Sequence, residues 1–195
     1  MRRKDSRKAI IWEWVESIVV ALVLALVIRH FVIQAFKIPT GSMRMTLIEG
    51  DRILVNKFIY GAKIPFTDIR LPAPRQPKRG DVVVFVYPED PKKDFIKRLV
   101  GLPGETVEIK KGNIYINGEL CRDLSVYNRY YYNRPETIYG SEGEAVNVPQ
   151  DSYYVLGDNS ASSRDSRYWG FVPKKNMLGA AILNYWPPNR IKIIK

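Results

Sequence analysis

Histidine and cysteine are nearly absent from this sequence: among 195 residues there is one histidine, His30, and one cysteine, Cys121. A single cysteine excludes an intramolecular disulfide framework. So few imidazoles and thiols also exclude a metal site built from several of them. A Ser–His–Asp triad or a Cys–His pair would need His30. The position of His30 therefore decides whether such a mechanism is open to this chain.

Negative charge is also in short supply, because 31 lysines and arginines face 20 aspartates and glutamates, for a net charge of +11. This imbalance suits an anionic partner, either a nucleic acid or an anionic lipid surface. Hydrophobic residues make up 46% of the chain, which excludes disorder for most of it. The length suits one packed domain, or one domain with an anchor.

Residues 18–28 form a run without a polar side-chain atom, and its extension to 17–36 gives about twenty residues, or roughly 30 Å as a helix. We predict a transmembrane anchor over 17–36, preceded by a basic cytoplasmic segment over 1–16. The ends carry residues typical of a membrane interface, namely Trp12, Trp14, Arg29 and His30. A buried core helix and a cleaved signal peptide are the alternatives, although no small-x-small cleavage site follows the run.

The charge asymmetry around this segment predicts its orientation. Residues 1–8 hold five positive charges and one negative charge, so the amino-terminal end should stay in the cytoplasm. Residues 37–195 would then form an extracytoplasmic domain, which argues against a nucleic-acid partner. His30 would lie at the membrane, out of reach of a soluble active site.

Most of the chain after the anchor is typical of β-structure. Residues 106–110 and 113–117 alternate around Lys111 and Gly112, a strong hairpin pattern. We therefore predict a mainly β domain whose strands are mostly antiparallel and strongly bent. The other predicted strands are 52–58, 81–87, 152–156 and 179–186. Residues 122–147 read as an inserted lobe; its interleaved tyrosines and arginines would suit single-stranded nucleic acid, or simply an amphipathic surface.

Three segments carry polar residues that could do chemistry. Residues 38–43, IPTGSM, form a turn that would project Ser42, although a plain linker is the alternative. Lys97 lies in an alternating strand, so it is either a lysine that protects a sheet edge or a buried base with a lowered pKa. Residues 157–173 are rich in hydroxyls and charges, and the adjoining aromatic residues favour a packed loop over a solvated one.

Together these segments resemble the motif boxes of type I signal peptidases, the serine–lysine endopeptidases that remove signal peptides from exported proteins. The resemblance runs through most of residues 15–187. It departs from the family pattern at Met45, where the family often has proline. The matching segments are 38–43, 50–57 (GDRILVNK), 79–85 (RGDVVVF), 96–105 (IKRLVGLPGE) and 157–173.

The resemblance implies a role for each matching residue. Ser42 corresponds to the nucleophile and Lys97 to its general base. The Ser42 amide and the Thr40 hydroxyl correspond to the oxyanion hole. Ser163 corresponds to the residue that orients the lysine. A supporting polar network would consist of Asp165, Arg167 and Arg98, and the substrate pocket of Phe36, Ile38, Val84 and Ile96.

The resemblance also implies a bacterial cell-membrane enzyme that needs no cofactor and no metal. Its partners would be preproteins cut after an Ala-x-Ala type of site, the lipid bilayer and the secretion translocon, with no nucleic acid. Two other functions stay open at this point: a peptidase dedicated to one substrate, and a non-catalytic tethered β-domain that binds secretory components. A binder of anionic lipid or nucleic acid would rest on charge alone.

Overall fold

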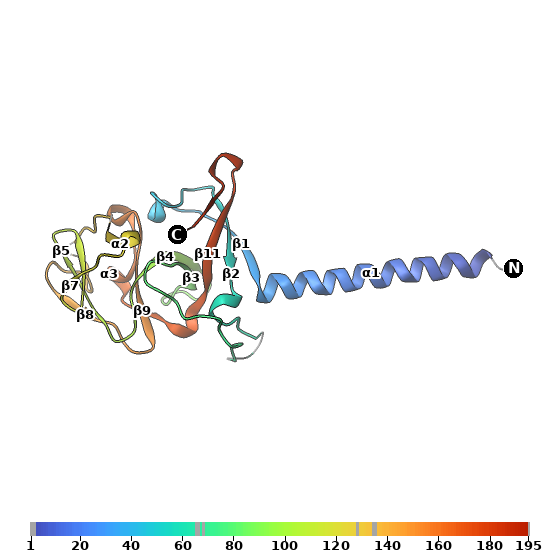
Figure 1. Ribbon diagram of the computed structural model, residues 1–195, viewed down its shortest axis with the longest axis horizontal. Helices are drawn as coiled ribbons and strands as arrows, with labels where there is room; N and C mark the ends of the chain where they lie inside the picture. The colour runs from blue at the N-terminus through green and yellow to red at the C-terminus, as the bar shows by residue number, and fades with distance from the viewer. Residues whose placement is uncertain (1–2, 65–66, 68, 128, 134–135, 195) are drawn as a thin grey trace.

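A single long helix, α1 (Arg3–Phe31), projects from a β-domain in the computed structural model, which describes residues 3–64, 67, 69–127, 129–133 and 136–194 (Figure 1). Its segment Ile10–Phe31 has a mean hydropathy of 2.2, long and apolar enough to cross a membrane. None of the most apolar part of this segment is buried inside the protein. The alternative of a buried core helix is therefore wrong.

The helix ends earlier than the sequence pattern suggested. We predicted an anchor over 17–36, but residues after Phe31 leave the helix and β1 (Ile33–Lys37) begins two residues later. The reason is pairing: β1 hydrogen-bonds along its length to β2 (Arg52–Asn56) in antiparallel register. A short apolar stretch is compatible with a helix or with a half-buried strand. Hydropathy alone therefore placed the end of the helix at residue 36 and not at Phe31.

The large sheet has eight strands, all paired antiparallel, in the order β1-β2-β11-β3-β4-β9-β10 with β12 also on β11. Strand β11 shows breaks of register against both β2 and β3, which allow the sheet to curl. The prediction of a mainly β, bent and antiparallel fold is confirmed. The bounds of the remaining strands are β3 (Val82–Val86), β4 (Asp94–Gly101), β9 (Ser152–Leu156), β10 (Val172–Pro173), β11 (Met177–Trp186) and β12 (Lys192–Ile193).

A second sheet of four strands lies at the end of the domain far from α1 (Figure 1). The predicted hairpin is present in it: Lys110 pairs with Asn113, and Lys111 and Gly112 have φ of 49° and 75°. Positive φ at both turn residues is the pattern of a type I′ turn. The strands, in spatial order, are β7 (Glu119–Leu120), β6 (Asn113–Ile116), β5 (Thr106–Lys110) and β8 (Ala145–Asn147).

The segment expected as an inserted lobe, 122–147, is packed into this second layer where the structure describes it. Strand β8 pairs with β5, and Tyr131 is only 1% exposed within the apolar core between the sheets. Asn128, Arg134 and Pro135 of this segment lie outside the described residues. The short helices in the described chain are α2 (Leu124–Tyr127), α3 (Ser166–Trp169), η1 (Gly41–Met43), η2 (Phe58–Tyr60), η3 (Ser160–Ser162), η4 (Lys174–Asn176) and η5 (Pro188–Arg190).

Candidate active site

Ser42 lies in the single 3₁₀ turn η1, which follows β1 after an extended stretch through Thr40. The ladder of β1 continues past its end, because Ile38 donates to Asp51 and accepts from Gly50. The turn then buries Ser42, at 7% exposure, and Met43 against the sheet. This places a serine hydroxyl at the inner surface of the domain, although the segment itself reads as a linker.

Asn159 holds the backbone of this turn, a contact that the sequence analysis did not predict. Its amide N–H donates to the Ser42 carbonyl at 3.0 Å, and its side-chain Nδ2 donates to the Gly41 carbonyl at 2.9 Å. Two hydrogen bonds from one residue fix the position of the serine relative to the loop after β9. The sequence pointed to Asn159 only through the GDN triplet of residues 157–159, which lies in the polar segment 157–173.

Lys97, on β4, reaches Ser42 from the other side. Its Nζ lies 2.8 Å from Ser42 Oγ and donates to the Ile96 carbonyl at 3.0 Å. The lysine side chain is 4% exposed, and its Nζ stands 5.3 Å from the centroid of the Phe95 ring. The two residues that resemble a nucleophile and its base therefore meet in one hydrogen bond, although 55 residues separate them.

Burial lowers the pKa of the Lys97 amine from its ordinary value of 10.5 to about 8. Desolvation is the largest cause, because a protonated amine loses its water shell in the interior. The carboxylates of Asp165 and Asp158 oppose this shift by favouring the charged form, and the nearby Arg167 guanidinium adds to it. The result is a lysine that is largely neutral in mildly alkaline solution.

Arg98 points to the opposite face of β4 and is also fully buried, so both basic residues of this strand lie inside. Both are covered because other parts of the protein pack on both faces of β4. Arg98 forms a two-pronged ion pair with Asp158, with Nε–Oδ1 at 2.7 Å and Nη2–Oδ2 at 2.8 Å. Arg129 also donates to the Asp158 carboxylate, at 3.2 Å. From the sequence we expected Arg98 in one network with Asp165 and Arg167, and we did not predict its partner Asp158.

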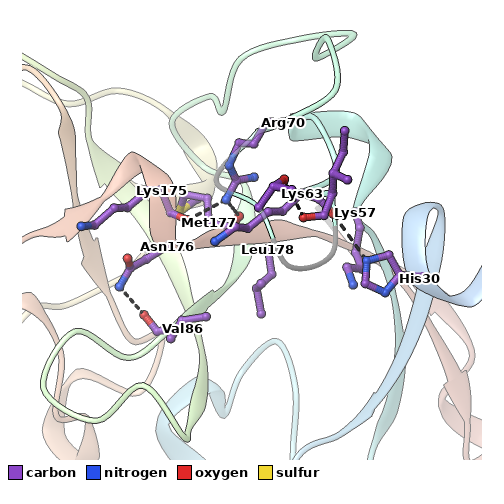
Figure 2. Close-up of a pocket in the computed structure, with 11 residues that line it drawn as sticks. His30, Lys57, Lys63, Arg70, Val86, Lys175, Asn176, Met177 and Leu178 are labelled. Carbon is purple, nitrogen blue, oxygen red and sulfur yellow. Dashed lines mark hydrogen bonds between the residues drawn. The ribbon is translucent and has the colours of Figure 1, made fainter.

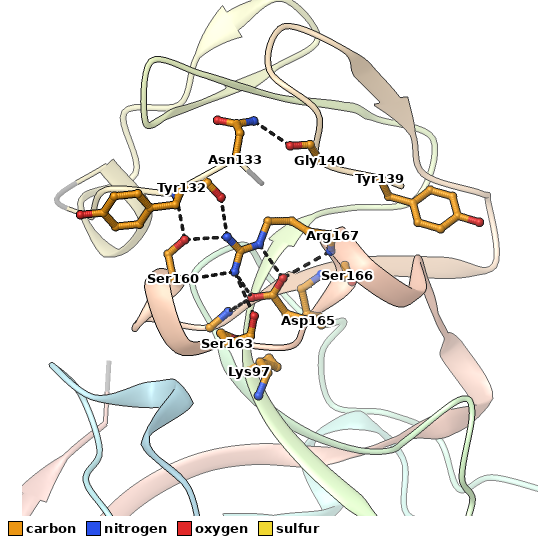
Figure 3. A network of polar contacts seen from close by, with 12 residues as sticks. Lys97, Tyr132, Asn133, Tyr139, Gly140, Ser160, Ser163, Asp165, Ser166 and Arg167 are labelled. Atoms are coloured by element: carbon orange, nitrogen blue, oxygen red, sulfur yellow. Dashed lines mark hydrogen bonds and ion pairs between the residues drawn. The ribbon is translucent and has the colours of Figure 1, made fainter. Parts of the chain in front are cut away.

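Asp165 and Arg167 form the other buried pair (Figure 3). The Arg167 Nε and Nη2 both donate to the Asp165 carboxylate at 2.8 Å, and Asp165 also accepts from the Gly157 amide at 2.9 Å. Arg167 further donates to the carbonyls of Tyr132 and Ser160, which ties the 157–167 loop to the segment that we expected to be a lobe. Figure 3 shows this network next to Lys97.

Ser163 lies inside the site, but it does not make the predicted contact. It is 5% exposed, and its Oγ has no hydrogen-bond partner among the residues that the structure describes. It is close to Ser42: a Cβ on Gly157 would stand 2.1 Å from Ser163 Oγ and 2.6 Å from the Ser42 carbonyl oxygen. A buried hydroxyl with no partner costs free energy and calls for an explanation. Gly157 is required here because any side chain would overlap both serines.

Thr40 and Met45 lie on either side of the turn that carries Ser42. The Thr40 side chain is exposed and makes no capping hydrogen bond to the turn, so its hydroxyl is free to act elsewhere. Met45 has φ of 91°, a value that proline cannot adopt because its ring holds φ near −65°. The departure from the family pattern at this position therefore goes with a different backbone conformation in the turn.

The four predicted pocket residues pack together in one apolar cluster with Met43. Ile38 and Val84 are buried, and Phe36 and Ile96 are only partly covered. Ile38 also lines an open hollow of about 520 Å³, together with Lys37, Pro39, Glu49 and Gly50. The apolar surface near Ser42 comes from Phe36 and Ile96, which are partly uncovered.

His30 lies away from this site, at the end of α1, where its Nε2 is 3.4 Å from the Lys63 carbonyl (Figure 2). Within the described part of the chain, no group of three or more His, Cys, Asp or Glu side chains could hold a metal ion. The chemistry that these residues support is nucleophilic attack by Ser42 with proton transfer to Lys97.

Known proteins match this chain over most of its length. A family model described as "Signal peptidase, peptidase S26" matches residues 11–186. Signal peptidase I of Pseudomonas aeruginosa is 36% identical over 94% of this chain and 76% of its own length. Probable signal peptidase I-2 of Synechocystis is 39% identical over 99% of this chain and 82% of its own length. A crystal structure of a signal peptidase I from Enterococcus faecalis is 33% identical over 54% of this chain and 97% of that chain, with a TM-score of 0.42.

The Arg98–Asp158 pair yields a stability prediction. We expect Asp158→Ala to lower the free energy of unfolding by about 3–5 kcal/mol, because it leaves the Arg98 charge buried without its carboxylate. The matched control is Asp90→Ala, which removes an exposed pair with Lys93 and should leave the unfolding midpoint near that of the wild type. Chemical denaturation of the full chain in detergent, followed by circular dichroism, measures both. Equal midpoints for the two variants would contradict a structural role for the buried pair.

Proposed function

The chain belongs to the signal peptidase family, peptidase S26, and we propose that it cleaves signal peptides from preproteins with Ser42 as nucleophile and Lys97 as general base. The observation that carries this proposal is the 2.8 Å contact between Lys97 Nζ and Ser42 Oγ, made by a buried amine whose pKa is lowered to about 8. A lysine with an ordinary pKa would be protonated at neutral pH and could not accept a proton. The same contact disfavours a non-catalytic tethered domain.

In the first step, the neutral Lys97 amine takes the Ser42 hydroxyl proton while Ser42 Oγ attacks the scissile carbonyl carbon. The carbonyl oxygen becomes an oxyanion, which the Ser42 amide and the Thr40 hydroxyl stabilise. The exposed, uncapped Thr40 hydroxyl beside the turn supports this role. The Lys97 ammonium then gives its proton to the departing amine, and the carbon–nitrogen bond breaks to leave an acyl-enzyme ester.

Water completes the reaction. Lys97 takes a proton from the attacking water, and the second tetrahedral intermediate collapses as Ser42 Oγ leaves and recovers a proton from the lysine. Ser163 stays the candidate to orient the lysine although the two side chains are not hydrogen-bonded in the free protein, because catalytic hydrogen bonds often form only when substrate binds. Its buried hydroxyl has no partner among the described residues and lies beside Ser42. The Arg98–Asp158 and Asp165–Arg167 pairs support the site, since both anchor the loop that holds Ser42 and Ser163.

The apolar cluster beside Ser42 suits a substrate with small side chains on either side of an unconstrained residue, as in an Ala-x-Ala site. Phe36 and Ile96 are partly uncovered and would form the walls that small side chains contact. Ile38 and Val84 would form the floor, because they are buried. A peptidase that is dedicated to one substrate would use the same chemistry, so precursor range separates the two functions.

The helix α1 is proposed as a single membrane anchor with its basic amino-terminal end in the cytoplasm and the β-domain outside a bacterial cell membrane. Its candidate span Ile10–Phe31 and the positive charge at residues 1–8 support this orientation. A cleaved signal peptide is disfavoured because the family match includes most of the helix and the chain enters β1 almost directly. Anchoring would hold the site where preproteins leave the translocon, which is a candidate partner.

Cleavage of a precursor whose signal ends in Ala-x-Ala tests the Ser42–Lys97 mechanism. We expect Lys97→Arg to lower the rate by about 10²–10⁴-fold, because guanidinium stays protonated and cannot accept the serine proton. Ser42→Ala should abolish turnover, and the exposed neighbour Lys93→Arg, as the control, should cleave at the wild-type rate. A folded Lys97→Arg enzyme that cuts as fast as the wild type would overturn the proposal. The circular dichroism spectrum of Lys97→Met, in which methionine replaces the amine, shows whether the domain folds without the lysine.

The lowered pKa of Lys97 predicts a pH profile. The active form is the neutral amine, so the wild-type rate should fall as pH drops below about 8 and level off above it. Single-turnover cleavage of one precursor across this range measures the midpoint. A rate that stays constant between about pH 7 and about pH 9 would contradict the assignment of Lys97 as the base.

Protease protection tests the topology. Protease that is added to intact spheroplasts should degrade the β-domain, because residues 37–195 would face outward. An unrelated cytoplasmic protein in the same cells serves as the control for intactness. Degradation of the β-domain only after lysis would reverse the proposed orientation.

A further inference from the structure

A hollow of about 680 Å³ lies beside the end of α1, separate from Ser42 and Lys97 (Figure 2). Segments far apart in the sequence form its walls: His30 from α1, five residues after β2, and residues 175–178, where η4 leads into β11. The five residues after β2 are Lys57, Lys63, Ile64, Thr67 and Arg70. Neither the proposed catalytic mechanism nor the predicted substrate pocket uses these residues. Its function is therefore open.

The hollow is basic. The eleven described residues that line it include four cationic side chains and His30, and none of these eleven carries a carboxylate. The cationic residues are Lys57, Lys63, Arg70 and Lys175. Figure 2 shows the Lys175 amine turned away from Arg70, so we consider Arg70 and Lys57 as the candidate anion ligands. Like charges that gather in one concave site raise the local concentration of an anion.

Arg70 is the most informative of these residues. Its guanidinium donates to the carbonyls of Gly61, Lys175 and Met177, at 2.9, 2.6 and 2.8 Å. These dipoles orient the side chain but do not neutralise its charge. Burial lowers the pKa of this guanidinium from its ordinary value of 12.5. A half-buried guanidinium that is held in place by carbonyls is a ready site for a phosphate oxygen.

Lys57 adds a second half-buried cation. Its Nζ donates to Gln34 Oε1 at 3.2 Å, and burial lowers its pKa against the weaker opposing effect of Asp94. Its backbone amide donates to the Val32 carbonyl at 2.9 Å, directly after α1. The cations are therefore attached to the end of the helix that is proposed to cross the membrane.

This position places the hollow at the level of lipid headgroups. With α1 across the bilayer, His30 lies at the outer end of the span Ile10–Phe31. Apolar side chains next to the cations in sequence are exposed, with Phe58 at 43% and Ile69 at 62%. Leu178 and Met177 add apolar surface inside the hollow. The acyl chains of a lipid would pack against this apolar surface, whereas a free anion would make no favourable contact with it.

We propose that this basic hollow, around Arg70 and Lys57, binds the phosphate of an anionic phospholipid headgroup in the outer leaflet. The inference rests on the proposed anchoring of α1, since only an anchored chain presents the hollow to headgroups. Bound lipid would fix the β-domain at a defined height on the bilayer. The attraction is the one by which basic pockets between transmembrane helices bind anionic lipid headgroups on the cytoplasmic side of a membrane.

Native mass spectrometry of the full chain in detergent micelles tests the proposal. Phosphatidylglycerol, phosphatidylcholine with the same acyl chains, and inorganic phosphate are added separately at equal concentration. We expect the wild type to retain one phosphatidylglycerol about tenfold more strongly than phosphatidylcholine, and inorganic phosphate in equal amount not to displace it.

Matched variants locate the site. Lys57→Gln should weaken phosphatidylglycerol retention about tenfold and should fold well, because burial already disfavours its charge. Arg70→Gln should do the same. Lys174→Gln is the control: it removes an equal charge from an exposed neighbouring position outside the hollow and should bind as the wild type does.

Several outcomes would overturn the proposal. Equal retention of both lipids, or equal loss in Lys57→Gln and Lys174→Gln, means that the hollow does not select the headgroup. Complete displacement by inorganic phosphate assigns the hollow to a free anion instead. Repeating the binding measurement with Ser42→Ala separates this question from catalysis, and alkaline carbonate extraction of membranes tests the anchor by itself.

Discussion

Burying Lys97 costs free energy as long as its amine is protonated, and the groups around it set how large this cost is. Two buried arginine–carboxylate pairs stand nearby, Arg98–Asp158 and Asp165–Arg167. Each arginine compensates one carboxylate, so neither acid is free to hold Lys97 as a permanent ammonium. The lysine can therefore lose its proton near pH 8 while the loop stays in place. The same pairs that tune the amine also connect the loop after β9 to the nucleophile turn.

The curled sheet brings together Ser42 and Lys97, the two residues of the proposed dyad. Strands β1 and β4 stand four positions apart in the sheet order, which is about 19 Å in a flat sheet. Ser42 follows β1 and Lys97 lies on β4, yet their side chains are 2.8 Å apart. Bending at the register breaks of β11 and the excursion of the chain after Ile38 close this distance. The geometry of the site is thus a property of the whole sheet.

Features that depend on local pattern could be predicted from the sequence, and features that depend on register could not. The hairpin at Lys111 and Gly112 follows from the residues themselves. The pairing of Arg98 with Asp158 follows from the alignment of β4 with β9, where Arg98 is opposite Leu156. No single segment reveals that alignment. For the same reason, the basic hollow has no sequence signature, since His30, Lys57, Arg70 and residues 175–178 meet only in the fold.

The junction between α1 and β1 has a mechanical consequence. Only Val32 separates the helix from the strand, and its carbonyl and amide are both hydrogen-bonded, to Lys57 and Ile28. Such a short junction provides no flexible linker, so the β-domain cannot rotate freely relative to α1. With the helix across a bilayer, Ser42 would stand at a constant depth relative to the membrane surface. The distance between a peptide bond and the bilayer would then help to determine where the preprotein is cut, in addition to the side chains around that bond.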